Sequence, residues 1–208
     1  MTEAAGLARE DQKLRKLVDD ALARGASSAT IVPVRDIFVD KRARLKCLVP
    51  RCSCYGSHLM CPPSIMPVKE FREILGLYHH ALLLQVEAEA DSSDKSPKGL
   101  DGPLCDKIES ETAARKWQLK LLRAVGGCEA AAFKMGFYYA AGLSGGECCL
   151  CDECVGANSS EGCRHPFEAR PSMEAMGIDV IKTCKKAGMP VLLSSKAKVR
   201  WTGLVLID

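Results

Sequence analysis

Four cysteines in the second half of the chain have a spacing that suits a metal cluster. In the segment GGECCLCDECVGANSSEGCRHP, two residues separate each neighbouring pair in the run Cys148, Cys151 and Cys154, and eight residues separate Cys154 from Cys163. Three thiolates at this interval can ligate one face of a cubane cluster, as in bacterial ferredoxins, and a fourth from a flexible loop can complete the set. We therefore predict that residues 142–171 form a loop motif that binds a 4Fe–4S cluster through these four thiolates.

Two features of this group leave alternatives open. A structural zinc ion also takes four cysteines, although zinc sites usually use two separate pairs instead of a run of three. Cys149 adjoins Cys148 and could replace it as the first ligand, although the spacing favours Cys148.

The residues that flank this group also bear on its chemistry. Gly142, Gly145 and Gly146 precede the cysteines and could let backbone N–H groups approach the cluster sulfurs. His165 and Arg170 follow the last cysteine and could offset the cluster charge, pass a proton or contact a substrate. A histidine beside a proline more often stabilises its loop through a hydrogen bond.

A second cysteine group, residues 47–63, has a looser pattern. Four residues separate Cys47 from Cys52, and eight separate Cys52 from Cys61. Two prolines follow Cys61 directly, and a proline often follows a cluster-ligating cysteine because its fixed φ keeps the loop rigid. This group is predicted to form a loop and could hold a second cluster. Its cysteines could instead be buried small apolar residues or supply one ligand to the other site.

The fourth ligand of this second cluster stays open. Cys54 could supply it, but only one residue separates it from Cys52, so the two side chains tend to point apart. His58 or a water molecule could take the position instead. An iron with an exchangeable fourth position could bind a small substrate, as in an enzyme, whereas a fully ligated cluster mainly transfers electrons.

Composition favours metal ligation over disulfide bonding. The chain has 12 cysteines in 208 residues, and its N-terminus lacks the continuous apolar run of a secretory signal or a membrane span. We therefore expect a cytoplasmic protein, and clustered thiols in a reducing compartment indicate metal ligands before disulfides.

A formal charge of +3 gives no electrostatic reason to expect nucleic acid or membrane as a partner. The remaining cysteines are expected to be packed thiols: Cys105, Cys128 and Cys184.

Hydrophobic periodicity predicts strands and helices that alternate along the chain. Helical spacing of apolar residues predicts helices over 14–22, 68–78, 108–125 and 171–187, the last capped by Ser172. Branched or continuous apolar runs predict strands over 29–39, 80–88, 130–143 and 199–207, the first marked as an edge by Pro33. Residues 89–103 are expected to form a surface loop. We therefore expect one domain over residues 1–208 with an α/β or α+β fold, in which a single layered sheet carries helices and the cysteine loops lie at strand ends.

The strings RCSCYGSHLMCPP, CLCDEC and CRHPFEARPSMEAMGIDV make the chain resemble a family of cysteine-rich, predicted metal-binding proteins of anaerobic bacteria and methanogenic archaea. The resemblance spans most of the chain. It implies a single domain, iron–sulfur binding and an anaerobic cytoplasmic setting, but no particular reaction. The matching positions are Cys47, Cys52, Cys61, Pro62 and Pro63 in the first motif, and Cys148, Cys151, Cys154, Cys163, His165, Pro166, Arg170 and Pro171 in the second.

The leading hypothesis from the sequence is an iron–sulfur redox protein that exchanges electrons with a partner protein through one or two 4Fe–4S clusters. Its first rival is an iron–sulfur enzyme with an open iron site for a small substrate. Its second rival is an interaction module stabilised by zinc, without redox chemistry.

Overall fold

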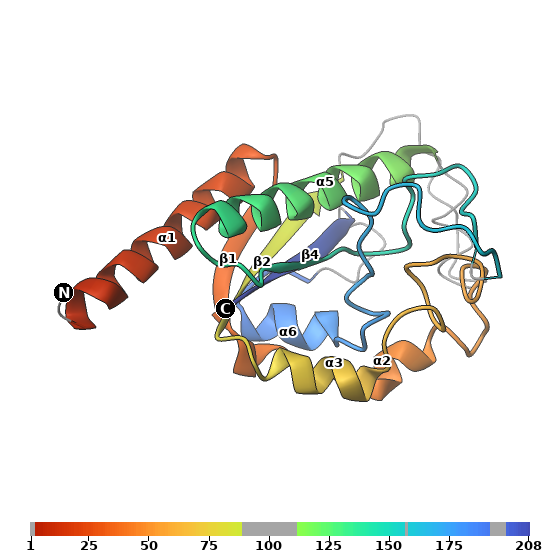
Figure 1. The fold of residues 1–208 in the computed structure, drawn as a ribbon, viewed down its shortest axis with the longest axis horizontal. Helices are drawn as coiled ribbons and strands as arrows, with labels where there is room; N and C mark the ends of the chain where they lie inside the picture. The colour runs from red at the N-terminus through yellow and green to blue at the C-terminus, as the bar shows by residue number, and fades with distance from the viewer. Residues whose placement is uncertain (1–2, 89–111, 157, 192–198) are drawn as a thin grey trace.

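A four-stranded antiparallel sheet forms the centre of the protein (Figure 1). The structure is a computed structural model that describes residues 3–88, 112–156, 158–191 and 199–208. Along the sheet the strands follow the order β1-β2-β4-β3. Their bounds are Ser28–Pro33 for β1, His80–Glu87 for β2, Ala141–Leu143 for β3 and Arg200–Ile207 for β4.

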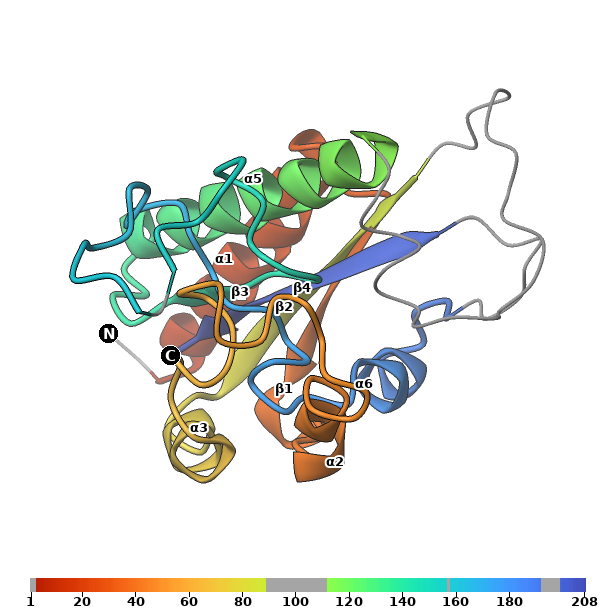
Figure 2. The same cartoon turned by 90° about the vertical axis from the view of Figure 1, so that its right-hand side faces the viewer.

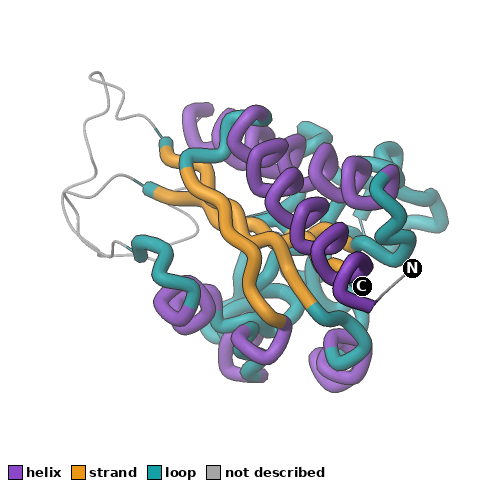
Figure 3. The backbone as a smooth tube through the Cα atoms, turned by 90° about the vertical axis from the view of Figure 1, so that its left-hand side faces the viewer, coloured by secondary structure: helices purple, strands orange, loops and turns teal. Residues whose placement is uncertain are grey.

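Helices cover both faces of this sheet, as Figures 1 and 3 show. The long helices α1 (Glu3–Ala23) and α5 (Thr112–Lys134) lie on one face. The short helices α3 (Val68–Leu75) and α6 (Val180–Lys186) pack on the opposite face. Between β1 and the first cysteine loop, the chain forms the short helices η1 (Val34–Asp36) and α2 (Lys41–Leu45). The molecule therefore has three layers.

Strand β2 shows why the sequence places the sheet in the middle. Leu82, Leu84 and Val86 belong to the apolar cluster under α1 and α5, whereas Ala81 and Leu83 belong to the cluster under α3 and α6. Because both faces of the strand are buried, its sequence is a continuous apolar run and does not alternate with polar residues. The predicted strands over 80–88 and 199–207 and the expected single layered sheet are confirmed. Since every pairing is antiparallel, the α+β alternative describes the sheet.

One predicted boundary, between a helix and the strand after it, is wrong. Helix α5 does not end at Gly126 and continues to Lys134, so the strand expected over 130–143 shrinks to β3. A Cβ on Gly127 would lie 2.3 Å from Arg24 Nη1. This glycine therefore leaves room on α5 for the Arg24 side chain, which directly follows α1, and it does not mark a helix end.

Two further boundaries differ from the prediction. The strand expected over 29–39 is the shorter β1, which ends at Pro33 and is followed by η1. As predicted, this strand lies at an edge of the sheet. The last helix begins at Val180 instead of Pro171, because turns occupy the intervening residues. The predicted cap is wrong as well: Asp179 caps α6 by accepting the N–H of Lys182, whereas Ser172 Oγ accepts the N–H of Ala175 at 3.1 Å within the preceding turn.

The helices over 14–22 and 68–78 are found at those positions, as α1 and α3. The loop expected over 89–103 and the beginning of the helix expected at 108 lie outside the described residues. Within the described ranges, no helix combines the length and the apolar character that a membrane span requires.

Candidate metal centre

Both cysteine groups lie in loops at the same end of the molecule, the end that faces the viewer in Figure 2. The first loop joins α2 to α3, and the second follows β3. The two loops touch, since Leu59 and Met60 of the first loop line the pocket of the second, and a Cβ on Gly156 would lie 3.4 Å from the Ser57 carbonyl oxygen. Residues far apart in the sequence thus contribute to one region.

Backbone hydrogen bonds close the second loop at its base. Ser144 pairs with Ser172 in a parallel bridge. The N–H of Ser144 donates to the Pro171 carbonyl at 2.9 Å, and the N–H of Met173 donates to the Ser144 carbonyl at 2.8 Å. The irregular segment that carries the cysteines is therefore anchored to the end of β3.

A partly buried ion pair fixes the same base from the side. Arg170 donates from Nε and Nη2 to the Glu129 carboxylate of α5, and Glu129 Oε2 also accepts the N–H of Gly142 at 2.8 Å. Arg170 Nη1 donates to the Ala169 carbonyl at 2.9 Å. The guanidinium thus holds the loop against α5, a structural role that the sequence did not predict for Arg170.

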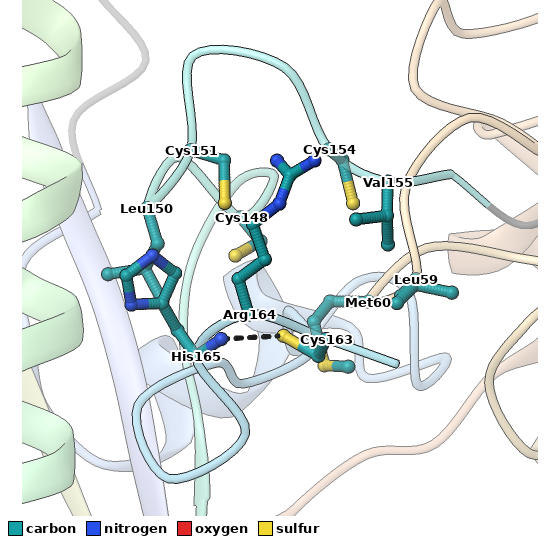
Figure 4. A pocket seen from close by; sticks show the side chains of 10 residues that line it. All are labelled: Leu59, Met60, Cys148, Leu150, Cys151, Cys154, Val155, Cys163, Arg164 and His165. Carbon is teal, nitrogen blue, oxygen red and sulfur yellow. Dashed lines mark hydrogen bonds between the residues drawn. The ribbon is translucent and has the colours of Figure 1, made fainter. Parts of the chain in front are cut away.

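The four thiols of the second group line a single pocket (Figure 4). All four cysteines are half-buried, and their Sγ atoms point toward the same space: Cys148, Cys151, Cys154 and Cys163. Apolar side chains from both loops complete the wall, namely Leu59, Met60, Leu150 and Val155, together with Arg164 and His165. The spacing-based grouping of these four residues therefore matches their arrangement in space.

Backbone N–H groups of the loop donate to two of these sulfurs. The N–H of His165 donates to Cys163 Sγ at 3.4 Å, as the dashed line in Figure 4 marks. The N–H of Leu150 bonds to the Cys148 thiolate and lowers its pKa. Each donor lies two residues after its cysteine, a pattern in which a tight turn presents an amide to the sulfur. Such bonds stabilise negative charge on a metal-bound thiolate.

The remaining electrostatics of the pocket oppose free thiolates. Burial is the main cause that raises the pKa of Cys148, and the charges of Cys163, Cys154 and Cys151 raise it further. Four thiolates that line one pocket would repel one another, and a bound metal cation would relieve this repulsion. The arrangement therefore suits a group that carries positive charge.

Cys149 faces a different environment from its neighbour Cys148. It is 8% exposed, and burial, with Glu147 and Cys148, raises its pKa to about 11, against a lowering effect of Arg115. Arg115 Nε donates to the Cys149 carbonyl at 3.2 Å. Because Cys149 does not line the pocket of the other four, the geometry favours Cys148 as the first ligand.

The three glycines before the cysteines allow close packing at the base of the loop, and the N–H of Gly142 donates to Glu129 and not to a sulfur. A Cβ on Gly142 would lie 2.5 Å from Glu129 Oε2, and one on Gly145 would lie 2.7 Å from the Thr202 carbonyl oxygen. One on Gly146 would meet Gln118 at 2.6 Å. These glycines let the loop base pack against α5 and β4, and the donors to sulfur come from Leu150 and His165.

In the first group, three cysteines lie near enough to Cys61 to raise the pKa of its thiol. Cys54 and Cys61 are buried, and Cys47 and Cys52 are half-buried. Burial raises the pKa of Cys61 strongly, and the charges of Cys54, Cys52 and Cys47, in that order, raise it further, followed by Glu147 from the second loop. The sequence did not decide whether Cys54 belongs to this group. Its effect on the pKa of Cys61 places it near the other three cysteines.

The histidines have local partners. His58 Nδ1 lies 3.1 Å from Ser57 Oγ, and His165 Nδ1 lies 3.7 Å from Glu168 Oε1. The carbonyl of His165 also accepts the N–H groups of Glu168 and Ala169. These contacts agree with the loop-stabilising role considered for His165.

Outside the two groups, Cys128 and Cys184 are fully buried as predicted, while Cys105 lies outside the described residues. In the described part of the chain, no set of three or more histidine, cysteine, aspartate or glutamate side chains forms a group that could hold a metal ion in its present positions.

The cysteine loops and most of the sheet fall within a known family model. Residues 30–207 match the model described as predicted metal-binding protein (DUF2284). The chain belongs to this family. Metal binding thus agrees with the resemblance drawn from the cysteine motifs. Neither a curated protein nor a solved structure matches the chain.

Some residues of this DUF2284 site could not be found from the sequence pattern. Glu129 and Arg115 come from α5, far from the cysteines in sequence, and no motif marks them. Leu59 and Met60 lie between cysteines of the first group but line the pocket of the second. Arg164 is the exception, because its place directly after the predicted ligand Cys163 indicates that it lies near the pocket.

Proposed function

We propose that this protein binds a 4Fe–4S cluster through Cys148, Cys151, Cys154 and Cys163 and uses it to exchange single electrons with a partner protein. The observation that carries the proposal is that these four thiols, and not Cys149, line one pocket together. A run of three cysteines with a fourth from the same loop is the ligand pattern of ferredoxin clusters.

The surroundings of the pocket fit such a cluster. Amide donors reach Cys148 and Cys163, and hydrogen bonds to cluster sulfurs are among the features that set the reduction potential. Leu59, Met60 and Val155 place apolar side chains beside the pocket, and such surroundings influence the potential of a cluster. The bound cluster would supply one-electron chemistry, and the residues of this chain would position it and adjust its potential.

The first group is proposed to hold a second cluster on Cys47, Cys52 and Cys61, with Cys54 as its fourth ligand. The burial of Cys54 and its effect on Cys61 support this choice over His58, whose ring nitrogen pairs with Ser57. Four thiolates would leave no open iron, which favours electron transfer over the enzyme alternative. Contact between the two loops suits passage of electrons between the two sites. We expect the protein to work in the reducing, anaerobic cytoplasm, where free thiols persist.

Anaerobic purification followed by visible absorption and counts of iron, sulfide and zinc tests the proposal. We expect a broad brown absorption band and acid-labile sulfide equal to iron. Cys151→Ala should lose about four irons per chain, while the matched variant Cys149→Ala, one residue from the same ligand run, should keep them. Colourless protein with zinc would identify the interaction-module alternative instead. Equal iron loss in both variants would show that Cys149 belongs to the ligand set.

A further inference from the structure

The segment that leads into the first cysteine loop concentrates positive charge. Residues 41–51, KRARLKCLVPR, contain no acidic residue, although the formal net charge of the whole chain is only +3. The five cationic side chains are Lys41, Arg42, Arg44, Lys46 and Arg51. The near balance of the whole chain therefore hides a strongly basic local surface beside the cysteines.

The contacts of these cations within the described part of the chain include one ion pair, one hydrogen bond to a backbone carbonyl and one cation–π contact. Arg42 forms an ion pair with Asp40 at 2.6 Å, and Arg44 Nη1 donates to the Met66 carbonyl at 2.9 Å, which ties α2 to the far end of the first loop. Among the described residues, no carboxylate lies within ion-pair distance of Lys41, Lys46 or Arg51. Arg51 lies over the Tyr55 ring at 5.4 Å.

Apolar side chains are exposed among these cations. Leu45 is 50% exposed, Leu48 46% and Val49 68%, and Met66 adds a further 38% from the end of the loop. Exposed apolar residues that alternate with cations along one short segment are typical of a protein interface, in which apolar contacts lie among charged ones. Phosphate-directed nucleic-acid surfaces rely on cations and do not need such apolar contacts.

We infer that this surface, formed by α2 and the start of the first cysteine loop, docks an acidic one-electron carrier protein. The inference rests on the proposed function, because a carrier docked here would lie against the loop that holds Cys47, Cys52 and Cys54. Charge complementarity selects the acidic partner and speeds its encounter, while Leu45, Leu48 and Val49 supply the apolar contact. Electrons would thus enter or leave through the first group.

Binding of an acidic plant-type 2Fe–2S ferredoxin to the immobilised full-length protein, measured without oxygen, tests the inference. We expect binding at about 50 mM salt that weakens about tenfold at about 300 mM. Lys41→Glu with Lys46→Glu should weaken binding about tenfold, and Val49→Ser about threefold without changing the salt dependence. The matched control is Lys16→Glu with Lys134→Glu, which makes the same charge change at exposed positions of α1 and α5 and should stay within about twofold of wild type.

Wild-type affinity in either test variant, or an equal loss in the control, would overturn the docking surface. Tighter binding of a short DNA duplex than of ferredoxin would overturn it in favour of a nucleic-acid site. Iron is counted on the same samples, so a protein that binds ferredoxin as expected but holds no iron would contradict only the proposed cluster. A protein with full iron and no ferredoxin binding would contradict only the docking surface.

Discussion

Arg170, at the end of the second cysteine loop, forms a two-pronged ion pair with Glu129 of α5. Arg170 Nε lies 2.7 Å from Oε2 and Nη2 lies 2.8 Å from Oε1. Because Oε2 also accepts the N–H of Gly142, one carboxylate holds the chain both before and after the cysteines. The pair contacts no sulfur, yet it sets where the loop begins and ends.

Arg170→Met should therefore weaken both the fold and metal retention. The two side chains are only 16% and 21% exposed, so the change leaves a largely buried carboxylate without its cation, at a cost of about 2–3 kcal/mol. Urea unfolding of the metal-free protein measures this loss, and chelator challenge should release iron faster. Arg42→Met, which removes the exposed pair with Asp40, is the control and should lower stability much less than Arg170→Met, because solvent screens that pair. Equal costs for the two variants would show that Arg170 does not anchor the loop.

Gly146→Ala should destabilise the loop base. Gly146 has a φ of +74°, and an added Cβ would lie 2.6 Å from Gln118 Nε2 and 3.0 Å from the Trp201 ring. Backbone strain and the clash together predict a loss of about 1–3 kcal/mol, measured as a lower Tm. Gly162→Ala lies in the same loop with no atom within 4 Å of the new Cβ and should be neutral or slightly stabilising. A comparable Tm drop for Gly162→Ala would argue against this explanation.

The buried thiol of Cys128 should make stability fall at alkaline pH. Burial, helped by Asp20 and opposed by Arg24, raises its pKa from 9.0 to about 12. The folded state therefore keeps the proton after the unfolded state has released it. The contribution of Cys128 to stability is complete below pH 9 and is lost as the pH rises toward 12.

We expect unfolding of the metal-free protein by urea to show this loss, on the order of 1–2 kcal/mol between pH 9 and about pH 11. Other thiols titrate in the same range, so the comparison is between wild type and Cys128→Ala. Parallel pH curves for the two proteins would contradict a raised pKa at Cys128.

The local pattern of apolar residues was enough to predict the strands that are buried along most of their length. β2 and β4 were found because continuous apolar runs leave little choice of structure, and the cysteine loops because prolines and glycines exclude a long helix there. The end of α5 was missed because Gly126 and Gly127 resemble a helix stop. Long-range packing outweighs that local signal, since α1 packs along α5 and the Arg24 side chain takes the space that a Cβ on Gly127 would need.

The candidate site divides in the same way. The four thiols of the second group are close in sequence, so their spacing was informative about their common pocket. The pairing of Glu129 with Arg170 spans 41 positions, and nothing in either local sequence specifies the other. The role of Cys54 could not be decided either, because it depends on how the first loop folds around Cys61 and not on spacing.

The first group offers the sharpest test of whether the protein holds two fully ligated clusters. In wild type we expect about eight irons per chain, falling to about four in both Cys54→Ala and Cys61→Ala. Cys184→Ala removes a buried thiol of α6 outside both groups and should keep about eight. Iron and sulfide counts, with electron paramagnetic resonance of the reduced protein, provide the measurement.

Each other pattern of counts has a distinct meaning. If Cys54→Ala keeps about eight irons while Cys61→Ala loses about four, the first cluster has three protein thiolates and an open iron, which would favour the enzyme alternative. If wild type and all three variants hold about four irons, the first group binds no cluster and its thiols serve packing. Loss in both Cys54→Ala and Cys61→Ala is the outcome that the proposed cluster with four protein thiolates predicts, because removal of either ligand should release the same cluster.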